Sequence, residues 1–238
     1  MLEKFVHRLA RRLGVNLSRY TVVSDQYELL TYWGQQCQVD TLVDVGANVG
    51  QFSLRMIDAG WTGSILSVEP LSSAHAKLVE MAALTSRWKV AAPAALGATE
   101  GIATINVAGN SQSSSLLPML RRHEQAAPDS SYVRTETVAV KTLPQVLTEA
   151  GLSGRFILKL DVQGFEGEVL KGAAPVLDRC PIVFTEMSLQ PLYAGEPLFY
   201  ELSATLIGMG YRCVNIKPGY FDQNKREVVQ VDGTFVRD

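Results

Sequence analysis

From residue 40 onward, short apolar runs alternate with segments of helical periodicity along almost the whole chain. Strands are predicted over residues 41–45, 64–68, 89–96, 102–107, 136–140, 156–160, 182–186, 211–216, 227–231 and 234–236. Helices are predicted over residues 49–59, 74–84, 144–150, 166–171 and 198–209. Parallel strands require a crossover connection, which an intervening helix supplies. The alternation therefore predicts an α/β fold with a mostly parallel sheet and helices on both faces.

The end of the chain departs from this alternation. The last two predicted strands are separated only by Asp232 and Gly233, a pair typical of a tight turn. This spacing predicts a hairpin, and hence an antiparallel strand at that end of the sheet. No linker interrupts residues 39–238, so we expect one domain there, preceded by a helical segment over residues 1–38. In open sheets of this kind, ligands bind at the carboxyl ends of the strands.

The charge balance argues against a nucleic-acid partner. The chain has 22 Lys and Arg against 24 Asp and Glu, whereas nucleic-acid binders carry a basic excess or a basic stripe. Its three cysteines form no Cys-x-x-Cys pair, so neither a zinc site nor a disulfide framework is indicated. No apolar run approaches the ~18 residues that a membrane span needs. These features predict a cytoplasmic protein.

Residues 1–20 carry an amphipathic pattern. Apolar side chains recur at helical spacing, with basic side chains between them: Leu2, Phe5, Val6, Leu9 and Leu13 against Lys4, Arg8, Arg11 and Arg12. Two interpretations stay open. The helix either docks on the domain or makes a peripheral contact with an anionic membrane surface.

The most informative stretch is DVGANVG (44–50), where an apolar strand runs into a glycine turn and a helix follows. Gly46 permits a sharp turn and lets a ligand approach the backbone closely. A dinucleotide fingerprint would read Gly-x-Gly-x-x-Gly, but Asn48 stands at its middle glycine. The carboxylate of Asp44 would repel a pyrophosphate and suits the ammonium group of a methionine moiety. Glu69, at the end of the next predicted strand, is placed to accept both hydroxyls of a ribose.

A second group of charged residues follows the strand predicted over 156–160. Lys159 and Asp161 are two residues apart, so they point to the same face of that strand. Glu186 ends the next strand at the same level, and we expect it to converge with Asp161. Two carboxylates that share a site either hold a divalent cation such as Mg²⁺ or accept protons. Alternatively, Lys159 pairs with Glu166 or Glu186 in a structural ion network.

Four segments together resemble the FkbM family of methyltransferases: GANVG (46–50), SVEP (67–70), KLDVQGFEGEVLKGA (159–173) and IVFTEMS (182–188). The resemblance covers about residues 40–211. It implies a Rossmann-like class I methyltransferase fold with a seven-stranded, mostly parallel sheet. It also implies S-adenosylmethionine as the methyl donor and a hydroxyl of a sugar, in a glycolipid or glycan, or of a polyketide as the acceptor.

The resemblance also implies roles for individual residues. The donor loop is expected to comprise Asp44, Gly46, Asn48 and Gly50, with Glu69 on the ribose. The second family motif matches Lys159, Asp161 and Glu166, and the acidic strand end matches Glu186. Gln163 departs from the family pattern, which often has Glu there. The neutral amide puts a metal role of the motif in doubt.

An acceptor hydroxyl needs a base or a metal that lowers its pKa. We expect Asp161 to be this base, with Lys159 and Glu186 as further catalytic residues and Glu186 assisting directly or through a divalent ion. Asp161 and Glu186 are accordingly the candidate metal ligands.

The polar segment 110–132 is long for a connection inside a domain, and such segments are often functional lids. Its Ser113, Ser114, Ser115, Arg121, Arg122 and His123 suit a polar, hydroxyl-rich acceptor, and Ser114 is also a candidate donor-binding residue. A surface loop without function is the alternative.

Three other functions fit the sequence less well. An NAD-dependent oxidoreductase on the same scaffold conflicts with the missing fingerprint glycine and with Asp44. Methylation of nucleic-acid bases conflicts with the Asp161–Gly164 sequence DVQG, where an Asn/Asp-Pro-Pro-aromatic strand end is usual. A non-catalytic module that binds S-adenosylmethionine conflicts with two intact acidic strand ends.

Overall fold

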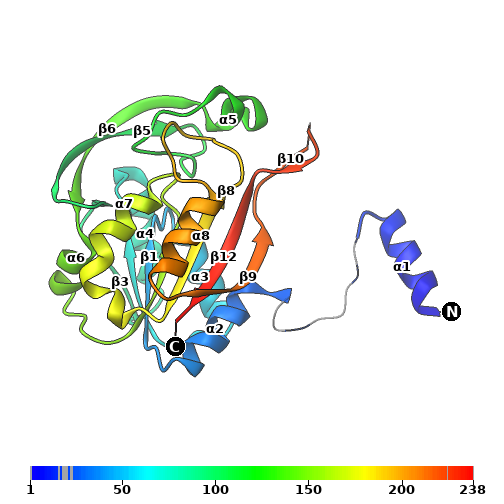
Figure 1. The fold of residues 1–238 in the computed structure, drawn as a ribbon, viewed down its shortest axis with the longest axis horizontal. Coiled ribbons are helices and arrows are strands. Elements are labelled where there is room, and N and C mark those ends of the chain that lie inside the picture. The colour runs from blue at the N-terminus through cyan, green and yellow to red at the C-terminus, as the bar shows by residue number, and fades with distance from the viewer. Residues whose placement is uncertain (1, 16, 18–20, 22–23, 224, 238) are drawn as a thin grey trace.

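The computed structural model describes residues 2–15, 17, 21, 24–223 and 225–237. Its main sheet has seven strands in the order β3-β2-β1-β7-β8-β12-β9. These strands are β3 (Trp88–Val90), β2 (Ser64–Val68), β1 (Thr41–Val45), β7 (Phe156–Leu160), β8 (Ile182–Ser188), β12 (Gln230–Val236) and β9 (Arg212–Pro218). The sheet is parallel from β3 to β8, and β12 runs antiparallel to both of its neighbours. The predicted Rossmann-like fold is thereby confirmed (Figure 1).

The predicted hairpin at the end of the chain is wrong. Asp232 and Gly233 lie inside β12, where they pair with Glu186 and Thr185 of β8. A Cβ on Gly233 would come within 2.3 Å of the Met187 side chain, so the glycine serves close packing rather than a turn. The antiparallel strand therefore lies between β8 and β9, and not at the edge of the sheet.

The strand predicted over 89–96 is also wrong, because the structure divides it. Its first part is β3 of the main sheet, and its last part is β4 (Ala95–Leu96) of a separate three-stranded sheet, in the order β4-β6-β5. In this sheet β5 (Gly101–Ala108) and β6 (Tyr132–Lys141) form a long antiparallel pair. The pair arches over one end of the main sheet (Figure 1).

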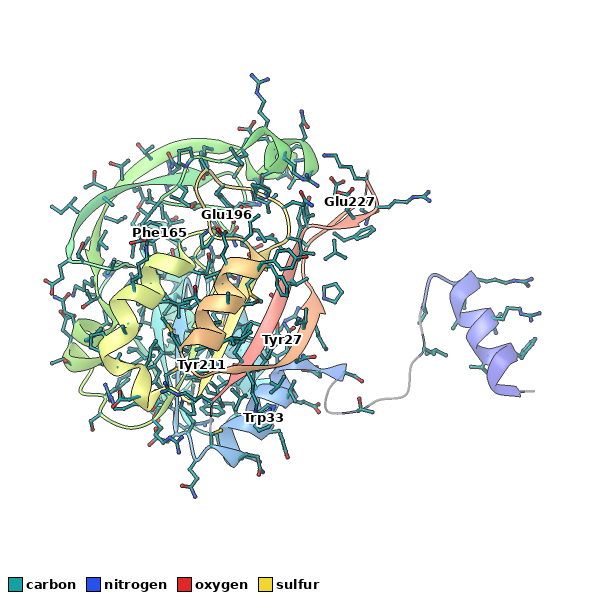
Figure 2. All side chains as sticks on the ribbon, viewed as in Figure 1. Tyr27, Trp33, Phe165, Glu196, Tyr211 and Glu227 are labelled. Atoms are coloured by element: carbon teal, nitrogen blue, oxygen red, sulfur yellow. The ribbon has the colours of Figure 1, made fainter. Side chains whose placement is uncertain are left out.

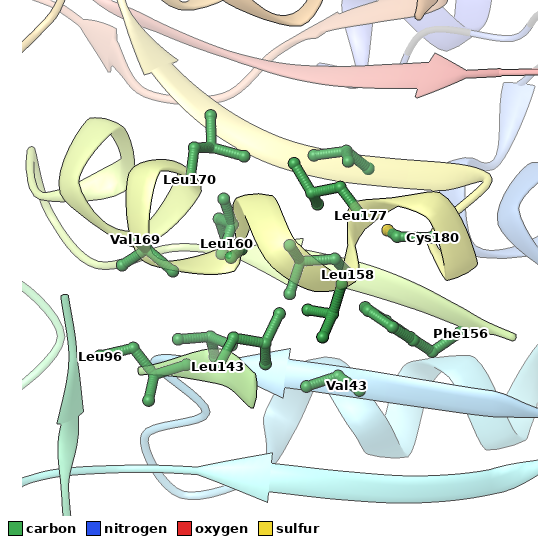
Figure 3. Close-up of a cluster of buried hydrophobic side chains, with 14 of the residues drawn as sticks. Val43, Leu96, Leu143, Phe156, Leu158, Leu160, Val169, Leu170, Leu177 and Cys180 are labelled. Carbon is green, nitrogen blue, oxygen red and sulfur yellow. The ribbon is translucent and has the colours of Figure 1, made fainter. Parts of the chain in front are cut away.

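Helices cover both faces of the main sheet. The apolar side chains of α2 (Gln26–Gln36), α3 (Gln51–Asp58) and α4 (Ser72–Ala82) pack on one face. Those of α6 (Leu143–Glu149), α7 (Glu166–Ala173) and α8 (Phe199–Gly208), with the 3₁₀ turn η3 (Ala174–Arg179), pack on the other. Figure 3 shows Leu158 and Leu160 of β7 between Leu170 of α7 and Leu143 of α6. Because central strands are buried on both faces, they read as nearly continuous apolar runs.

The helical segment predicted over 1–38 has two parts with different surroundings. Helix α2 begins at the N-cap Asp25, whose carboxylate accepts from the Tyr27 and Glu28 amides. Its Leu30 is fully buried in the same core cluster as Leu42 of β1. Helix α1 (Leu2–Arg12) instead stands apart from the body in Figure 1.

Part of the amphipathic segment 1–20 lies outside the described residues, namely 1, 16 and 18–20. Across the part of the chain that the structure describes, no helix is long and apolar enough to span a bilayer.

Candidate active site

A cavity of about 390 Å³ opens at the carboxyl ends of the parallel strands. Its floor comes from the ends of β2, β1, β7 and β8, and its roof comes from the segment 110–116 and from His123 and Ala127. The volume lies within the range of about 300–1,000 Å³ that is usual for small-molecule sites. The side chains around it divide into two groups, which we name after the expected positions of the methyl donor and the acceptor. The donor end lies near β1 and β2, and the acceptor end lies near β7, β8 and β12.

The glycine turn after β1 forms the donor end. Gly46 has a φ of 72°, and a Cβ there would lie 1.9 Å from the Asp161 carbonyl oxygen. Only glycine permits this approach between the ends of β1 and β7. Asn48 also has a positive φ, 47°, and its side-chain amide donates to Ser111 Oγ at 3.1 Å. Gly46 and Asn48 line the cavity, whereas Gly50 is the N-cap of α3 and packs against Trp88.

Asp44 and Lys159 form a buried ion pair behind the glycine turn. Their Cα positions are partners across β1 and β7, and Lys159 Nζ lies 2.9 Å from Asp44 Oδ1. Asp44 Oδ2 accepts from Ser53 Oγ at 2.7 Å, and Lys159 also donates to the Gly46 carbonyl at 2.9 Å. Burial lowers the pKa of Lys159, but the charges of Asp44 and Asp161 outweigh it and leave that pKa raised. Lys159 is therefore a cation, and its hydrogen bond to the Gly46 carbonyl holds the glycine turn in place. Neither Lys159 nor Asp44 lines the cavity.

Glu69 closes the donor end from the tip of β2. It is 4% exposed, and its two oxygens accept from the backbone amides of Asn48 and Leu71, each at 2.9 Å. Burial raises its pKa to about 7, against the opposing effect of these two hydrogen bonds. Each oxygen keeps a second lone pair for a ligand hydroxyl. Apolar walls stand beside it: Leu71, Ala94, Ala95, Leu96 and Ile105.

At the acceptor end, the side chain of Gln163 bridges the two predicted carboxylates. Its Nε2 donates to Asp161 Oδ1 at 2.7 Å and to Glu186 Oε2 at 2.8 Å. Its Oε1 accepts from the Tyr193 hydroxyl at 2.7 Å, so all of its polar atoms are engaged. Gln163 adopts a left-handed backbone with a φ of 54°, a conformation that persists only where surrounding contacts hold it. The three side-chain hydrogen bonds of Gln163 hold this conformation, together with the hydrogen bond of 2.6 Å that Ser115 Oγ donates to the Gln163 carbonyl.

The two carboxylates differ in their surroundings. Glu186 accepts from both Gln163 and Gln230, and burial together with the charges of Asp161 and Asp232 raises its pKa well above the usual value. Asp161 has a side chain that is 39% exposed, and its Oδ2 lies 3.8 Å from Lys159 Nζ. Glu186 therefore holds its proton to a higher pH than an ordinary carboxyl group does, while the side chain of Asp161 is the one open to the cavity.

The divalent cation expected between Asp161 and Glu186 finds no support. No group of three or more His, Cys, Asp or Glu side chains suited to a metal ion occurs among the described residues. The amide of Gln163 instead donates a hydrogen bond to one oxygen of Asp161 and to one oxygen of Glu186.

The segment 110–132 folds over the cavity as an ordered roof rather than as a peripheral loop. It contains α5 (Arg121–Ala126) and η2 (Pro128–Ser130). Ser113, Ser114 and Ser115 all line the cavity, but Ser114 Oγ is already bonded to the Ser111 carbonyl at 2.7 Å and the Ala108 amide at 3.0 Å. Arg122 does not line the cavity and pairs with Glu227 at 2.8 Å.

His123, one of the residues of this segment that were expected to suit the acceptor, does line the cavity. It is 4% exposed, and its ring meets Tyr193 edge-on at 5.2 Å between centroids. Its Nδ1 is buried without a hydrogen-bond partner, and burial lowers its pKa to about 4. A neutral imidazole with a free nitrogen suits an acceptor hydroxyl. The only sequence signal for it was its place in an unusually long polar connection.

The structure brings most of the predicted site residues together around one cavity. Those that line it are Gly46, Asn48, Glu69, Ser114, Asp161 and Glu186. Asp44, Gly50 and Lys159 lie behind the turn and support it. Gln163 joins the site from the second family motif, and His123 joins it from the segment 110–132. Gln230 joins it from β12, which no sequence motif connected to the site. Figure 2 shows Phe165, another lining residue, and Glu196 near the end of the sheet below the roof.

Comparison with known proteins agrees with this geometry. The family model of the methyltransferase FkbM domain matches residues 44–213. The 2-O-methyltransferase NoeI of Sinorhizobium fredii is 25% identical over 161 residues, which cover 65% of this chain and 66% of NoeI. The crystal structure of methyltransferase FkbM from Methylobacillus flagellatus superposes with a TM-score of 0.54 at 14% identity, covering 82% of this chain and 43% of that one.

The chain thus spans just under two thirds of NoeI and less than half of the solved FkbM protein. The structural likeness shows a shared fold, and the family match covers most of the chain, including both acidic strand ends. The match sets aside an oxidoreductase on the same scaffold. The chain belongs to the FkbM family of methyltransferases.

Proposed function

We propose that this protein transfers a methyl group from S-adenosylmethionine to a hydroxyl group of a small-molecule acceptor. The carrying observation is the single cavity that joins the glycine turn and Glu69 to the Asp161–Gln163–Glu186 cluster. S-adenosylmethionine, when bound, supplies a methyl group activated on a sulfonium.

The donor end fits the three parts of this cofactor. Glu69 keeps lone pairs for the ribose hydroxyls, and the apolar walls beside it suit an adenine ring. The backbone at Gly46 and Asn48 is open to the methionine moiety. The charge of Asp44 is neutralised by Lys159, so its contribution is to hold the turn in place rather than to contact the ammonium group.

At the acceptor end, Asp161 accepts the proton of the acceptor hydroxyl at Oδ2. Its Oδ1 is held by Gln163, which fixes the orientation of the carboxylate. Glu186, whose pKa is raised by burial, assists as a hydrogen-bonding group, and His123 offers its free nitrogen to a further hydroxyl. Positioning an acceptor against a bound donor removes much of the entropic barrier of such a reaction.

A sugar of a glycolipid or glycan is the acceptor that this lining favours, with a polyketide hydroxyl as the second candidate. The acceptor end carries several polar groups that are spaced apart: Ser113, Asp161, Gln163, Glu186, Gln230 and His123. Tyr220 adds an aromatic ring. The name of NoeI, a 2-O-methyltransferase, is consistent with methylation at oxygen.

The donor assignment is tested by thermal unfolding with S-adenosylhomocysteine or NAD. At a concentration about 100 times its Kd, a ligand stabilises by about 2.7 kcal/mol, which raises the Tm of a chain this long by several degrees. We expect a Tm shift with S-adenosylhomocysteine for the wild type and for the control Glu80→Ala, at an exposed position of α4. We expect no shift for Glu69→Ala. Each shift is measured from the ligand-free Tm of the same variant. This is necessary because Glu69→Ala also lowers the Tm by leaving two buried backbone amides without a hydrogen-bond acceptor. A shift with NAD alone overturns the donor assignment.

The acceptor class is tested with a donor that carries a labelled methyl group. Purified glycolipid, free glycan and polyketide fractions are offered separately, and the labelled product is treated with mild base. A methyl ether survives this treatment, whereas a methyl ester is hydrolysed. Label that is lost in base, or that is found on nitrogen, would contradict transfer to a hydroxyl.

A further inference from the structure

Helix α1 presents an apolar face that nothing in the described structure covers. Phe5 is 64% exposed, Leu9 49% and Leu13 74%. The Leu13 amide donates a hydrogen bond to the Leu9 carbonyl at 3.2 Å, so Leu13 continues the helical turn. Positions 5, 9 and 13 lie one turn apart, so these side chains form one stripe along the helix. Val6, 43% exposed, widens the stripe.

Basic charge is concentrated on the same helix. The residues of α1 include four Lys and Arg and one Glu, which leaves 18 Lys and Arg against 23 Asp and Glu in the rest of the chain. Arg8 and Arg12, both exposed, lie one turn apart beside the apolar stripe. An apolar face flanked by arginines is the pattern of helices that lie in the plane of an anionic bilayer.

We propose that α1 binds an anionic lipid surface, with Phe5, Val6, Leu9 and Leu13 among the acyl chains and Arg8 and Arg12 at the head groups. The charge complementarity selects lipid carrying net negative charge over a neutral surface. Eleven residues separate Leu13 from Asp25 at the start of α2, and the stretch from Leu13 to Asp25 reaches at most about 40 Å when fully extended. The helix therefore tethers the start of α2, and with it the domain, within that distance of the bilayer.

The test is co-sedimentation of the full chain with two kinds of vesicle, phosphatidylcholine alone and a mixture of phosphatidylcholine with phosphatidylglycerol at about 3:1. We expect binding to the anionic vesicles and little to the neutral ones. Arg8→Glu with Arg12→Glu should lower the partition coefficient about tenfold or more. Phe5→Ser with Leu9→Ser should abolish binding.

Matched controls separate α1 from the rest of the surface. Ile102→Ser with Val133→Ser removes two exposed apolar side chains from β5 and β6, and Lys89→Glu with Arg155→Glu reverses two exposed charges on the body. Both control variants should bind like the wild type. Wild-type protein that stays in the supernatant, or controls that lose binding as far as the α1 variants do, would overturn the proposal.

Two further readouts keep the result unambiguous. The Tm shift with S-adenosylhomocysteine, measured on the α1 variants, should equal that of the wild type, which separates a failed lipid site from a failed donor site. Sedimentation velocity without vesicles tests self-association. A dimer that disappears in Phe5→Ser with Leu9→Ser, without any vesicle binding by the wild type, would assign the stripe to a second copy instead.

Discussion

At the scale of single residues, the acceptor end depends on one side-chain amide that hydrogen-bonds two carboxyl groups in different surroundings. Gln163 donates to both Asp161 and Glu186, and only Asp161 keeps substantial exposure to the cavity. The cluster therefore combines one carboxylate open to the cavity with one buried carboxyl group whose pKa is raised. These states follow from the local contacts, and the two substitutions below test them.

Asp161→Asn should lower kcat by about 10²–10⁴-fold, because the amide cannot accept the acceptor proton. The Kd for S-adenosylhomocysteine should change by no more than a few-fold, because the donor end is untouched. Turnover and calorimetric binding measure the two quantities, with the exposed Asp178→Asn as the matched control. Loss of donor binding with Asp161→Asn would contradict the role of base.

Gln163→Glu should destabilise the protein at high pH. The substitution removes two donated hydrogen bonds and sets a third carboxylate against Asp161 and Glu186, at a cost of about 1–3 kcal/mol. We expect a Tm several degrees below the wild type at pH 8, with much of the loss recovered at pH 5, where the added carboxyl group is protonated. Gln36→Glu, on the exposed side of α2, should leave the Tm nearly unchanged at both pH values.

At the scale of elements, the site depends on the contact between the end of β1 and the end of β7. Gly46 lets the turn lie against the Asp161 carbonyl, and Lys159 ties the same turn to β7. The donor end and the acceptor end are thus held in register by one glycine and one buried lysine.

Gly46→Ala should unfold at a lower temperature and lose the Tm shift with S-adenosylhomocysteine. Both a positive φ and a clash at 1.9 Å oppose the new methyl group, and the clash forces the strand ends apart. Gly60→Ala is the matched control, because Gly60 has a φ of 87° but nothing within 4 Å of its Cβ position. Gly60→Ala should cost only about 1 kcal/mol and retain the ligand shift. Equal behaviour of the two variants would mean that the close approach is unimportant.

At the scale of the whole molecule, buried carboxyl groups set how stability varies with pH. Burial raises the pKa of Glu69 and of Glu166 to about 7 and that of Asp232 to about 6. A carboxyl group with a raised pKa stabilises the fold fully below its unfolded pKa and loses that contribution as pH rises through the folded value. His123 acts in the opposite sense, since its lowered pKa costs stability as pH falls from about 6.5 towards 4.

The three carboxyl groups outnumber the one histidine, so the ligand-free Tm should fall as pH rises from 5 to 8. A pH series of thermal unfolding measures the slope. Glu69→Gln cannot ionise and should flatten the slope, whereas Glu80→Gln on the exposed side of α4 should not. A Tm that rises steadily over this range would show that these groups do not ionise as their burial requires.

The sequence by itself determined the alternation of strands and helices, the glycine turn and the acidic strand ends. These features could be predicted because they depend on local periodicity and on residues whose backbone preferences act over a few positions. The same local signals failed at Asp232 and Gly233, where a pair typical of a turn lies inside β12 because Met187 leaves room only for glycine.

Only the tertiary structure decided which of the predicted charges meet the cavity. The pairing of Asp44 with Lys159 depends on the register between β1 and β7, two strands more than a hundred residues apart in the chain. The bridge by Gln163 and the entry of His123 depend on where loops from distant segments close over the sheet. A sequence pattern does not predict how close such segments lie in space, because strand register and the path of each loop follow from the packing of the whole core.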